Sequence, residues 1–153
     1  MSEGKARFMI GSLALFPEAC VLALQGIVEL NAKGLADSRF ETCLHWECVL
    51  VKMPVGHDLV PAAVLCFTHD APRALLWVQL SYVAEQFRGR GVYKAAYAAL
   101  RQIAQHRTCR SIEGATHVKN TAMRTVAKRM GRREEFVILV DDIEIVPNEV
   151  EAE

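Results

Sequence analysis

The spacing of apolar residues along the chain predicts where strands and helices lie. Residues 6–13 have strand character, and residues 16–34, FPEACVLALQGIVELNAKG, have the features of a helix. Pro17 suits a first helical turn, Glu18 complements the dipole of that end, and Gly34 offers a stop. For residues 35–42, a loop and a second short helix are both compatible with the sequence.

The middle of the chain predicts three strands in succession. Residues 44–53, 59–70 and 74–83 are largely apolar runs. The turn-forming segments PVGHD and HDAPR separate them. Short connections of this kind indicate an antiparallel meander.

The period then becomes helical. Residues 92–106 carry apolar side chains at helical spacing, 109–118 is bounded like a short strand, and 120–131 predicts another amphipathic helix. Residues 136–140, FVILV, predict a last strand, which DDIEIV continues or pairs with. The order β-α-(α)-β-β-β-α-β-α-β(-β) predicts an α/β (α+β) fold, with a mixed, mostly antiparallel central sheet flanked by helices.

Length and hydropathy narrow the class of protein. With 153 residues, the chain suits one domain over residues 1–147, followed by an acidic C-terminal tail at 148–153. No run approaches the roughly 18 apolar residues of a membrane span. The first residues show no clear charged segment and cleavage site. We therefore expect a cytoplasmic protein without a membrane anchor.

Charge is segregated along the chain although the net charge is zero. Residues 88–133 hold 12 of the 18 basic residues and one acid, and residues 134–153 hold eight acids and no base. A basic segment favours an anionic partner such as a phosphorylated cofactor or a nucleic acid. Aromatic residues within it are limited to Tyr93 and Tyr97, which gives few stacking platforms, so nucleic acid is the less favoured partner.

The five cysteines show no CxxC spacing, which favours reduced thiols. Cys43, His45 and Cys48 resemble a set of metal ligands at first sight. In a strand, however, Cys43 and His45 would point to one face and Cys48 to the other. We therefore predict no metal site.

The segment EQFRGRGVYKAAY, residues 85–97, is the main candidate for chemistry. Glycines after a strand let the backbone approach a ligand, and the free N–H groups of the following helix attract an anion. Arg88 and Arg90 would add charge-assisted contacts. A dinucleotide fingerprint starting at Gly89 would need glycine where Lys94 stands, and the Walker pattern is absent. A surface turn remains the alternative to a phosphate cradle.

Two blocks resemble the GNAT N-acetyltransferase superfamily. In VAEQFRGRGVYKAAYAAL, residues 83–100, Arg88 and Gly91 match its acetyl-CoA signature Q/R-x-x-G-x-G/A, and Tyr93 stands where the family has a small residue. In HVKNTAMRTVAKRMG, residues 117–131, Asn120 and Gly131 match a later segment. The resemblance spans most of the chain, although its specific residues are few.

The resemblance implies that the protein binds acetyl-CoA as cosubstrate between the diverging fourth and fifth strands. Backbone amides of residues 88–93 would hold the diphosphate, and Lys94, Lys119 and Arg124 could reach the 3′-phosphate. Main-chain groups of two strand residues and the Asn120 side chain would contact the pantetheine arm. The predicted cofactor-binding residues are Tyr82, Val83, Arg88, Gly89, Arg90, Gly91, Val92, Tyr93 and Asn120.

The implied reaction is direct attack of an amine on the thioester, with a small molecule or a protein as acceptor. Tyr82 and His117 are the candidates for a catalytic base, each with a structural role as the alternative. The family often has a tyrosine acid seven residues after the Asn, and Ala127 stands there. The alternative function is a catalytically degenerate GNAT-fold protein that binds acyl-CoA or a protein partner without turnover. The apolar last strand would allow a homodimer without requiring one.

Overall fold

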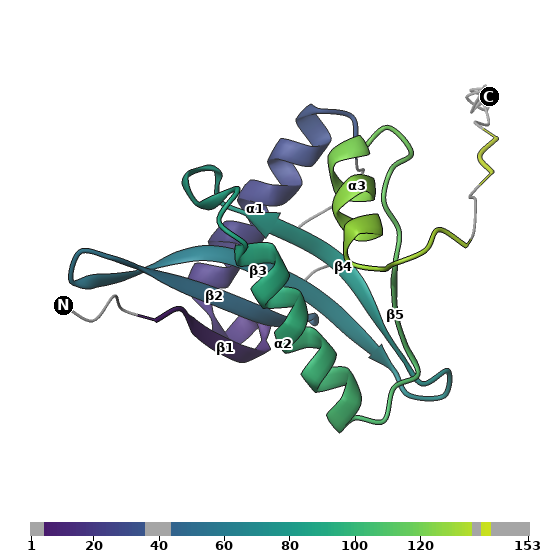
Figure 1. Ribbon diagram of the computed structural model, residues 1–153, viewed down its shortest axis with the longest axis horizontal. Coiled ribbons are helices and arrows are strands. Elements are labelled where there is room, and N and C mark those ends of the chain that lie inside the picture. The colour runs from purple at the N-terminus through teal and green to yellow at the C-terminus, as the bar shows by residue number, and fades with distance from the viewer. Residues whose placement is uncertain (1–4, 36–43, 136–138, 142–153) are drawn as a thin grey trace, which may run out of the picture.

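A five-stranded sheet forms the centre of the protein (Figure 1). The computed structural model describes residues 5–35, 44–135 and 139–141. The spatial order of the strands follows their order in the chain. They are β1 (Arg7–Ser12), β2 (Glu47–Val55), β3 (Asp58–Asp70), β4 (Leu75–Val83) and β5 (Ser111–Gly114).

The first four strands pair antiparallel, and β5 pairs parallel to β4. Every residue of β3 from Ala62 to Phe67 is buried, so both faces of the sheet are covered here. This continuous apolar run is what a central strand between two layers requires. The predicted mixed, mostly antiparallel sheet is confirmed.

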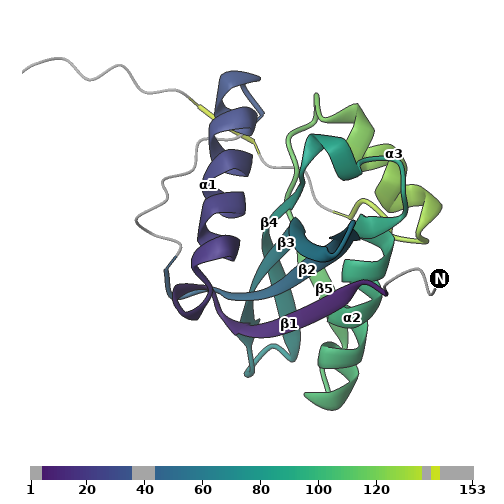
Figure 2. The same cartoon turned by 90° about the vertical axis from the view of Figure 1, so that its left-hand side faces the viewer.

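Helices cover the two faces of the sheet. Helix α1 (Pro17–Ala32) lies on one face and α2 (Val92–His106) on the other, with α3 (Thr121–Arg129) near the end of β4 (Figures 1 and 2). Short 3-10 helices, η1 (Leu13–Leu15) and η3 (Glu85–Phe87), precede α1 and follow β4. The buried stripe of α2 recurs at helical spacing, as the sequence predicts; it comprises Val92, Ala96, Tyr97, Leu100 and Ala104.

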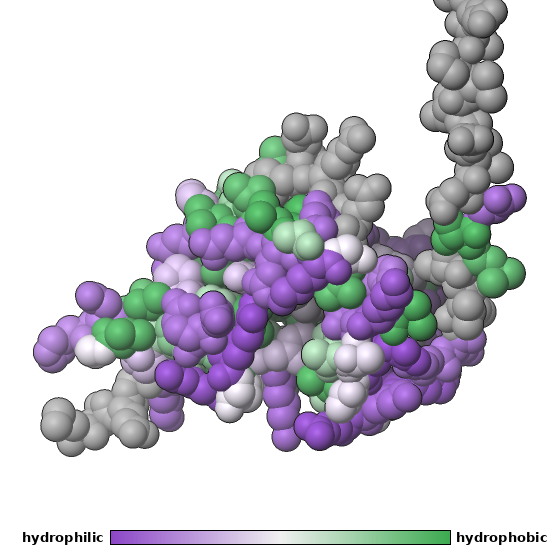
Figure 3. Space-filling view, turned by 90° about the horizontal axis from the view of Figure 1, so that it is seen from above, coloured by the Kyte–Doolittle hydropathy of each residue, from purple (hydrophilic) through white to green (hydrophobic). Residues whose placement is uncertain are grey.

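Helix α3 differs from the other two because it buries no residue among those described. Its predicted apolar stripe is only partly covered: Val126 is 36% exposed. Hydrophilic residues cover much of the face seen in Figure 3, with hydrophobic residues in smaller groups between them. The helix therefore lies at the edge of the fold, beside the open half of the sheet.

A glycine sets how closely α1 approaches β4. A Cβ added at Gly26 would lie 2.8 Å from the Cβ of Tyr82, closer than real side chains come. The absence of a side chain lets the helix rest directly on the strand. This contact fixes α1 against the half of β4 that matters for the site.

Two sequence predictions differ from the structure or fall outside it. The strand predicted at 109–118 is limited to Ser111–Gly114, because its pairing with β4 stops at Val78. The helix considered for 35–42 and the strands predicted over 136–146 lie almost wholly outside the described residues. Among those described, no helix combines the length and apolar character needed to cross a bilayer.

Candidate functional site

The sheet divides into a fork between β4 and β5. The two strands pair only from Leu75↔Ser111 to Val78↔Gly114. The next residue of β4, Gln79, forms a bulge, since Cys66 pairs with Leu80 and Phe67 with Val78. Beyond it, no described strand pairs with this side of β4. A bulge bends its strand, so the fork begins where the bend begins.

Gly114 closes the base of the fork. A Cβ at this position would meet the Val78 carbonyl oxygen at 3.1 Å. A side chain here would force the Val78 backbone to move by a few tenths of an ångström, so glycine suits this close pair. The base of the fork is therefore tightly packed, and the strands separate from there.

The register decides which backbone groups of β4 face the fork. The Ala84 N–H donates to the Ala62 carbonyl oxygen at 2.8 Å, toward β3. Because hydrogen-bonding direction alternates along a strand, the backbone groups of Tyr82 also face β3, and those of Ser81 and Val83 face the fork. The predicted main-chain contact fits Val83 but not Tyr82. Sequence reasoning missed Ser81, since nothing in the sequence indicates which alternate residues face β5.

A glycine loop lies at the open end of the fork. Gly89 and Gly91 both have φ of 74°, in the left-handed region, and Gly91 is the N-cap of α2. No side chain caps this end of the helix. Among the described residues, the amides from Gly89 to Tyr93 have no hydrogen-bond acceptor. Free N–H groups at a helix N-terminus attract an anion.

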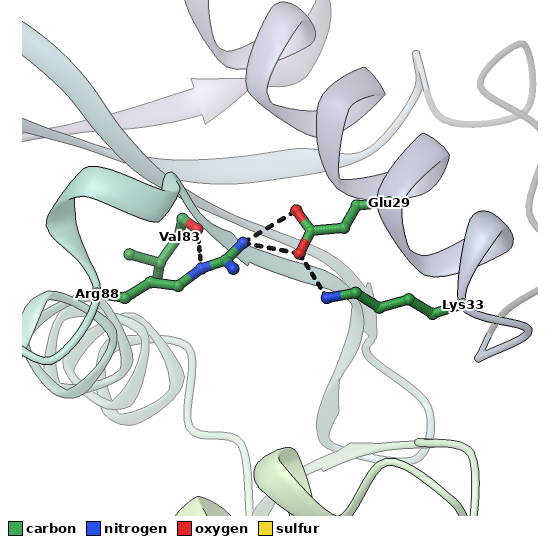
Figure 4. A network of polar contacts seen from close by, with 4 residues as sticks. All are labelled: Glu29, Lys33, Val83 and Arg88. Carbon is green, nitrogen blue, oxygen red and sulfur yellow. Dashed lines mark hydrogen bonds and ion pairs between the residues drawn. The ribbon is translucent and has the colours of Figure 1, made fainter.

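The Arg88 side chain points toward α1 and away from the glycine loop (Figure 4). Its guanidinium donates to both carboxylate oxygens of Glu29, at 3.0 and 2.9 Å, and its Nε donates to the Val83 carbonyl oxygen at 3.0 Å. Its backbone N–H donates to the Glu85 carbonyl oxygen at 3.2 Å. The prediction that Arg88 offers its amide and its charge to a phosphate does not fit this arrangement.

Glu29 joins α1 to the loop and was not predicted. Lys33, the C-cap residue of α1, contacts the same carboxylate at 2.8 Å. Hydrogen bonds from Arg88 and then Lys33 lower the pKa of Glu29 to about 2, against the opposing effect of burial. A carboxylate so strongly held in its ionised form is a poor proton acceptor at neutral pH. Glu29 is therefore an anchor for the loop and no general base.

The predicted cations differ in what they can still bind. Arg124 donates to both carboxylate oxygens of Glu134, at 2.7 and 3.0 Å, and to the Val118 carbonyl oxygen at 2.9 Å. Arg90 lies over the ring of Phe87 at 5.7 Å, and within the described part of the chain it has no acidic partner. Arg90 is thus the loop cation left for a phosphate.

Tyr82 lies between α1 and the Arg88 side chain. The guanidinium carbon of Arg88 is 5.6 Å from the centre of its ring. Burial, followed by the neighbouring Glu29 carboxylate, raises the pKa of Tyr82. A phenol with a raised pKa is protonated at neutral pH, so the geometry does not favour Tyr82 as a base.

His117 is exposed in the turn that follows β5. Its Nδ1 accepts a hydrogen bond from the Lys119 N–H at 3.1 Å. The proton of the neutral ring is then on Nε2, and the lone pair that could accept another proton is in use. His117 therefore gains no support as a base.

Asn120 is the N-cap of α3. Its Oδ1 accepts from the Met123 N–H at 3.2 Å, which satisfies one free donor of the helix. The NH₂ group points away from this bond and can still donate to a ligand. The predicted pantetheine contact is compatible with the cap, and it stays a prediction.

Two hydroxyls close to the fork have no partner. Tyr93 Oη and Ser81 Oγ are buried, and neither makes a hydrogen bond within the described residues. The Tyr93 ring lies 6.1 Å from that of Tyr97, measured between ring centres. Burial raises the pKa of Tyr93, while Arg132 and Ser81 lie near enough to oppose this without completing a hydrogen bond.

No group of three or more metal-binding side chains occurs among the residues that the structure describes. Cys43 lies outside them, and Cys48 is fully buried in β2. The site therefore consists of backbone amides, a strand edge and a few polar side chains.

Comparisons with known proteins agree with this geometry. A search of curated proteins found no match. Among solved structures, the aminoglycoside N-acetyltransferase AAC(6')-Iy in complex with CoA superposes with a TM-score of 0.68 at 20% identity, covering 93% of this chain and 98% of that one. The ribosomal-protein-alanine N-acetyltransferase from Brucella melitensis biovar Abortus 2308 has a TM-score of 0.66 at 16% identity, covering 91% and 100%.

These likenesses show the fold. A family model adds a match in the sequence itself, since the model of the Acetyltransferase (GNAT) family matches residues 30–131, which include α2, β5, α3 and the glycine loop. The chain therefore belongs to the GNAT acetyltransferase family.

Proposed function

We propose that this protein transfers the acetyl group of acetyl-CoA to an amine by direct attack of the amine on the thioester. The observation that carries the proposal is the position of the glycine loop at the open end of the fork. An anion held by the amides of residues 89–93 lies next to a strand edge with free hydrogen-bonding groups. A cosubstrate with a diphosphate and an extended amide-containing arm matches both features.

The arm would follow β4 as an added strand. Ser81 and Val83 face the fork, and the Val83 carbonyl already accepts from Arg88. The Val83 N–H and both backbone groups of Ser81 are then available to hydrogen-bond the pantetheine amides. On this proposal the NH₂ group of Asn120, which the cap leaves free, would donate to the same arm.

The acceptor is an amine, and the site favours its neutral form. Neither Glu29 nor Tyr82 is suited to take a proton, and His117 Nδ1 already accepts a hydrogen bond from the Lys119 N–H. An ammonium ion has no lone pair with which to attack. The rate should therefore rise with pH until the amine is deprotonated.

Calorimetry with acetyl-CoA tests binding, and release of free CoA thiol tests turnover. The amines would be spermidine, kanamycin and a short peptide with a free N-terminal alanine, since similar structures include enzymes for aminoglycosides and for a ribosomal-protein alanine. Binding with no thiol release from any amine would indicate a degenerate member of the family. Absence of binding would refute the proposal.

A matched pair of variants locates the site. Gly91→Ala forces a side chain into the left-handed region at φ 74°, although no atom lies within 4 Å of the new Cβ. Gly56→Ala imposes the same strain at φ 61°, in the turn between β2 and β3. We expect acetyl-CoA affinity to fall at least about tenfold in the first variant only. Equal affinities in both variants would contradict the assignment of the loop.

A further inference from the structure

A cavity lies between the C-terminal half of α2 and the start of β5. These two segments and the turn between β3 and β4 meet at one end of the protein (Figure 1). The cavity has a volume of about 230 Å³. The side chains that line it include Tyr97, Arg101, Gln105, Cys109, Arg110 and Ser111. The proposed acetyl transfer gives this cavity no task.

The lining carries positive charge and can donate hydrogen bonds. Arg101 and Arg110 each bring a guanidinium, and Gln105 adds an amide NH₂ group. Among the described residues, no carboxylate lines this cavity. The cavity between α1 and η3 is different, because Glu18 and Glu85 line it. The chemistry of the cavity at α2 and β5 therefore favours an anion.

Neither arginine of the cavity has an acidic partner in the part of the chain that the structure describes. Arg107, which lies between them in sequence, instead donates to both carboxylate oxygens of Glu47, at 2.7 and 2.6 Å. Arg101 donates to the Met130 carbonyl oxygen at 3.3 Å, so most of its five N–H groups remain available. Two like charges that face one cavity repel each other, and a bound anion would offset this repulsion.

A third unpaired cation lies near the cavity. The guanidinium carbons of Arg101 and Arg132 are 5.3 and 5.0 Å from the centre of the Tyr97 ring. An aromatic ring attracts a cation and helps to position it without removing its charge. Glu113, the carboxylate nearest in sequence, does not line the cavity and accepts a hydrogen bond from Ser111 Oγ at 3.0 Å. The positive charge at this end of α2 is therefore left uncompensated among the described residues.

The backbone beside the cavity is strained. Thr108 has φ of 56° and Ala74 has φ of 52°, both in the left-handed region that side chains disfavour. The turns that contain them are joined, since the Arg110 N–H donates to the Ala74 carbonyl oxygen at 2.6 Å. Strained residues other than glycine gather at functional sites. Here the strained turns lead the chain from α2 into β5 so that Arg110 lines the same cavity as Arg101.

We propose that this cavity binds a phosphate group, either as free phosphate or as the monoester of a small molecule. A phosphate dianion matches the charge of the two guanidiniums, and its oxygens accept hydrogen bonds from several directions, whereas a carboxylate is planar. The volume corresponds to about eight molecules of liquid water. Sites for larger ligands begin at about 300 Å³, so a whole nucleotide is too large.

The cavity is distinct from the glycine loop at the other end of α2. From Val92 to Gln105 the helix extends over about 20 Å at the usual rise per residue. A phosphate group in the cavity and a cosubstrate at the loop can therefore be bound at the same time. This inference goes beyond the proposed acetyl transfer and does not depend on it.

Cys109 provides a readout at the cavity itself, because its half-buried thiol lines it. The rate at which iodoacetamide alkylates Cys109 is followed by mass spectrometry at rising concentrations of inorganic phosphate, with sodium chloride holding the ionic strength constant. We expect the rate to fall about fivefold at saturation, because the bound group blocks access to the sulfur. The Kd should be about 1 mM, as suits a ligand of few atoms. Cys20, half-buried in α1, is the internal control and should keep its rate.

The source of the phosphate group is tested with glycerol 3-phosphate in the same assay. A lower Kd for glycerol 3-phosphate than for inorganic phosphate would identify the ligand as a monoester. A higher Kd would identify it as free phosphate.

Three matched variants each remove one guanidinium. Arg101→Gln and Arg110→Gln should each raise the Kd of phosphate at least about tenfold, since each loses a charge-assisted contact. Arg7→Gln removes an exposed arginine of β1, which has no acidic partner among the described residues, and should leave the Kd within about twofold. Titration calorimetry with phosphate repeats this comparison without the thiol.

Several results would overturn the inference. They are phosphate without effect on Cys109 and without heat of binding, protection that survives in both cavity variants, and protection that Cys20 shares. Loss of protection in Arg90→Gln would also overturn it, because the phosphate would then be at the glycine loop. Failure of the protein to bind acetyl-CoA would refute the proposed function and leave this inference standing.

Discussion

Replacing Glu29 with Gln removes one charge from the junction of α1 and the loop with little change in shape. The carboxylate lies 2.9 Å from Arg88 and 2.8 Å from Lys33, and its pKa is about 2 against an ordinary 4.5. At about 1.4 kcal/mol per pKa unit, this difference sets an upper bound of roughly 3 kcal/mol. The Arg88 and Lys33 side chains are 42% and 57% exposed, so solvent screens both contacts. We therefore expect a loss of about 1 kcal/mol in the free energy of unfolding at pH 7.

The dependence on pH follows from the direction of the shift. The pKa of Glu29 is lower in the folded than in the unfolded protein, so ionisation stabilises the fold above pH 4.5. This stabilisation is lost as the pH falls toward about 2, where the folded protein also takes up the proton. The difference between the wild-type protein and the variant should be full at pH 7 and should vanish across this window.

Urea unfolding followed by tryptophan fluorescence measures the difference at pH values from 7 down to about 2.5. The same substitution in an Arg88→Gln background is the control, because the main partner of the carboxylate is then already gone. In that background we expect only the smaller contribution of Lys33. A difference that is absent at pH 7, or as large near pH 2.5 as at pH 7, would refute the reasoning.

Three other changes test separate contacts. Gly26→Ala should lower the free energy of unfolding by about 1 kcal/mol, since overpacking against Tyr82 outweighs the gain in helix propensity; increased stability in urea would contradict this. Asn120→Ala should lose about 1 kcal/mol with the cap on Met123, whereas Asn120→Asp should keep the cap and weaken only acetyl-CoA binding, as unfolding and calorimetry would show. Burial raises the pKa of Cys48 to about 12, so a thiol reagent at pH 8 should leave it unlabelled until the protein unfolds, which mass spectrometry would detect.

The glycine loop could be predicted from sequence because its geometry is local. Gly89 and Gly91 follow a strand and precede a helix within a few residues, and both adopt the left-handed conformation that glycine allows. Strand, loop and helix each leave their own mark on the spacing of apolar residues. The same holds for Asn120, whose residue type and position before a helix indicate an N-cap.

The anchoring of Arg88 could not be predicted in this way. Its partner Glu29 is 59 residues away, and the only local signal at Glu29 is its spacing of four from Lys33. An arginine beside two glycines has the same sequence signature whether it faces a phosphate or a carboxylate. Packing of α1 on β4 decides between the two, and that depends on tertiary structure.

The sequence also could not predict where the strands end or which of their backbone groups face the fork. The segment 109–118 has strand character throughout, but strand pairing needs a partner, and β4 turns away after the bulge at Gln79. One extra residue in β4 likewise sets which backbone groups are presented to the fork. This is why the sequence could not indicate that the main chain of Ser81, and not that of Tyr82, faces the fork.

The open half of β4 also bears on the solubility of the free protein. A strand edge with unsatisfied N–H and C=O groups is a template on which a second polypeptide can add. An acetyl-CoA molecule lying along that edge would cap those groups as a covering strand does. Bound acetyl-CoA should therefore slow aggregation. Stored solutions of the protein should become turbid later when it is present.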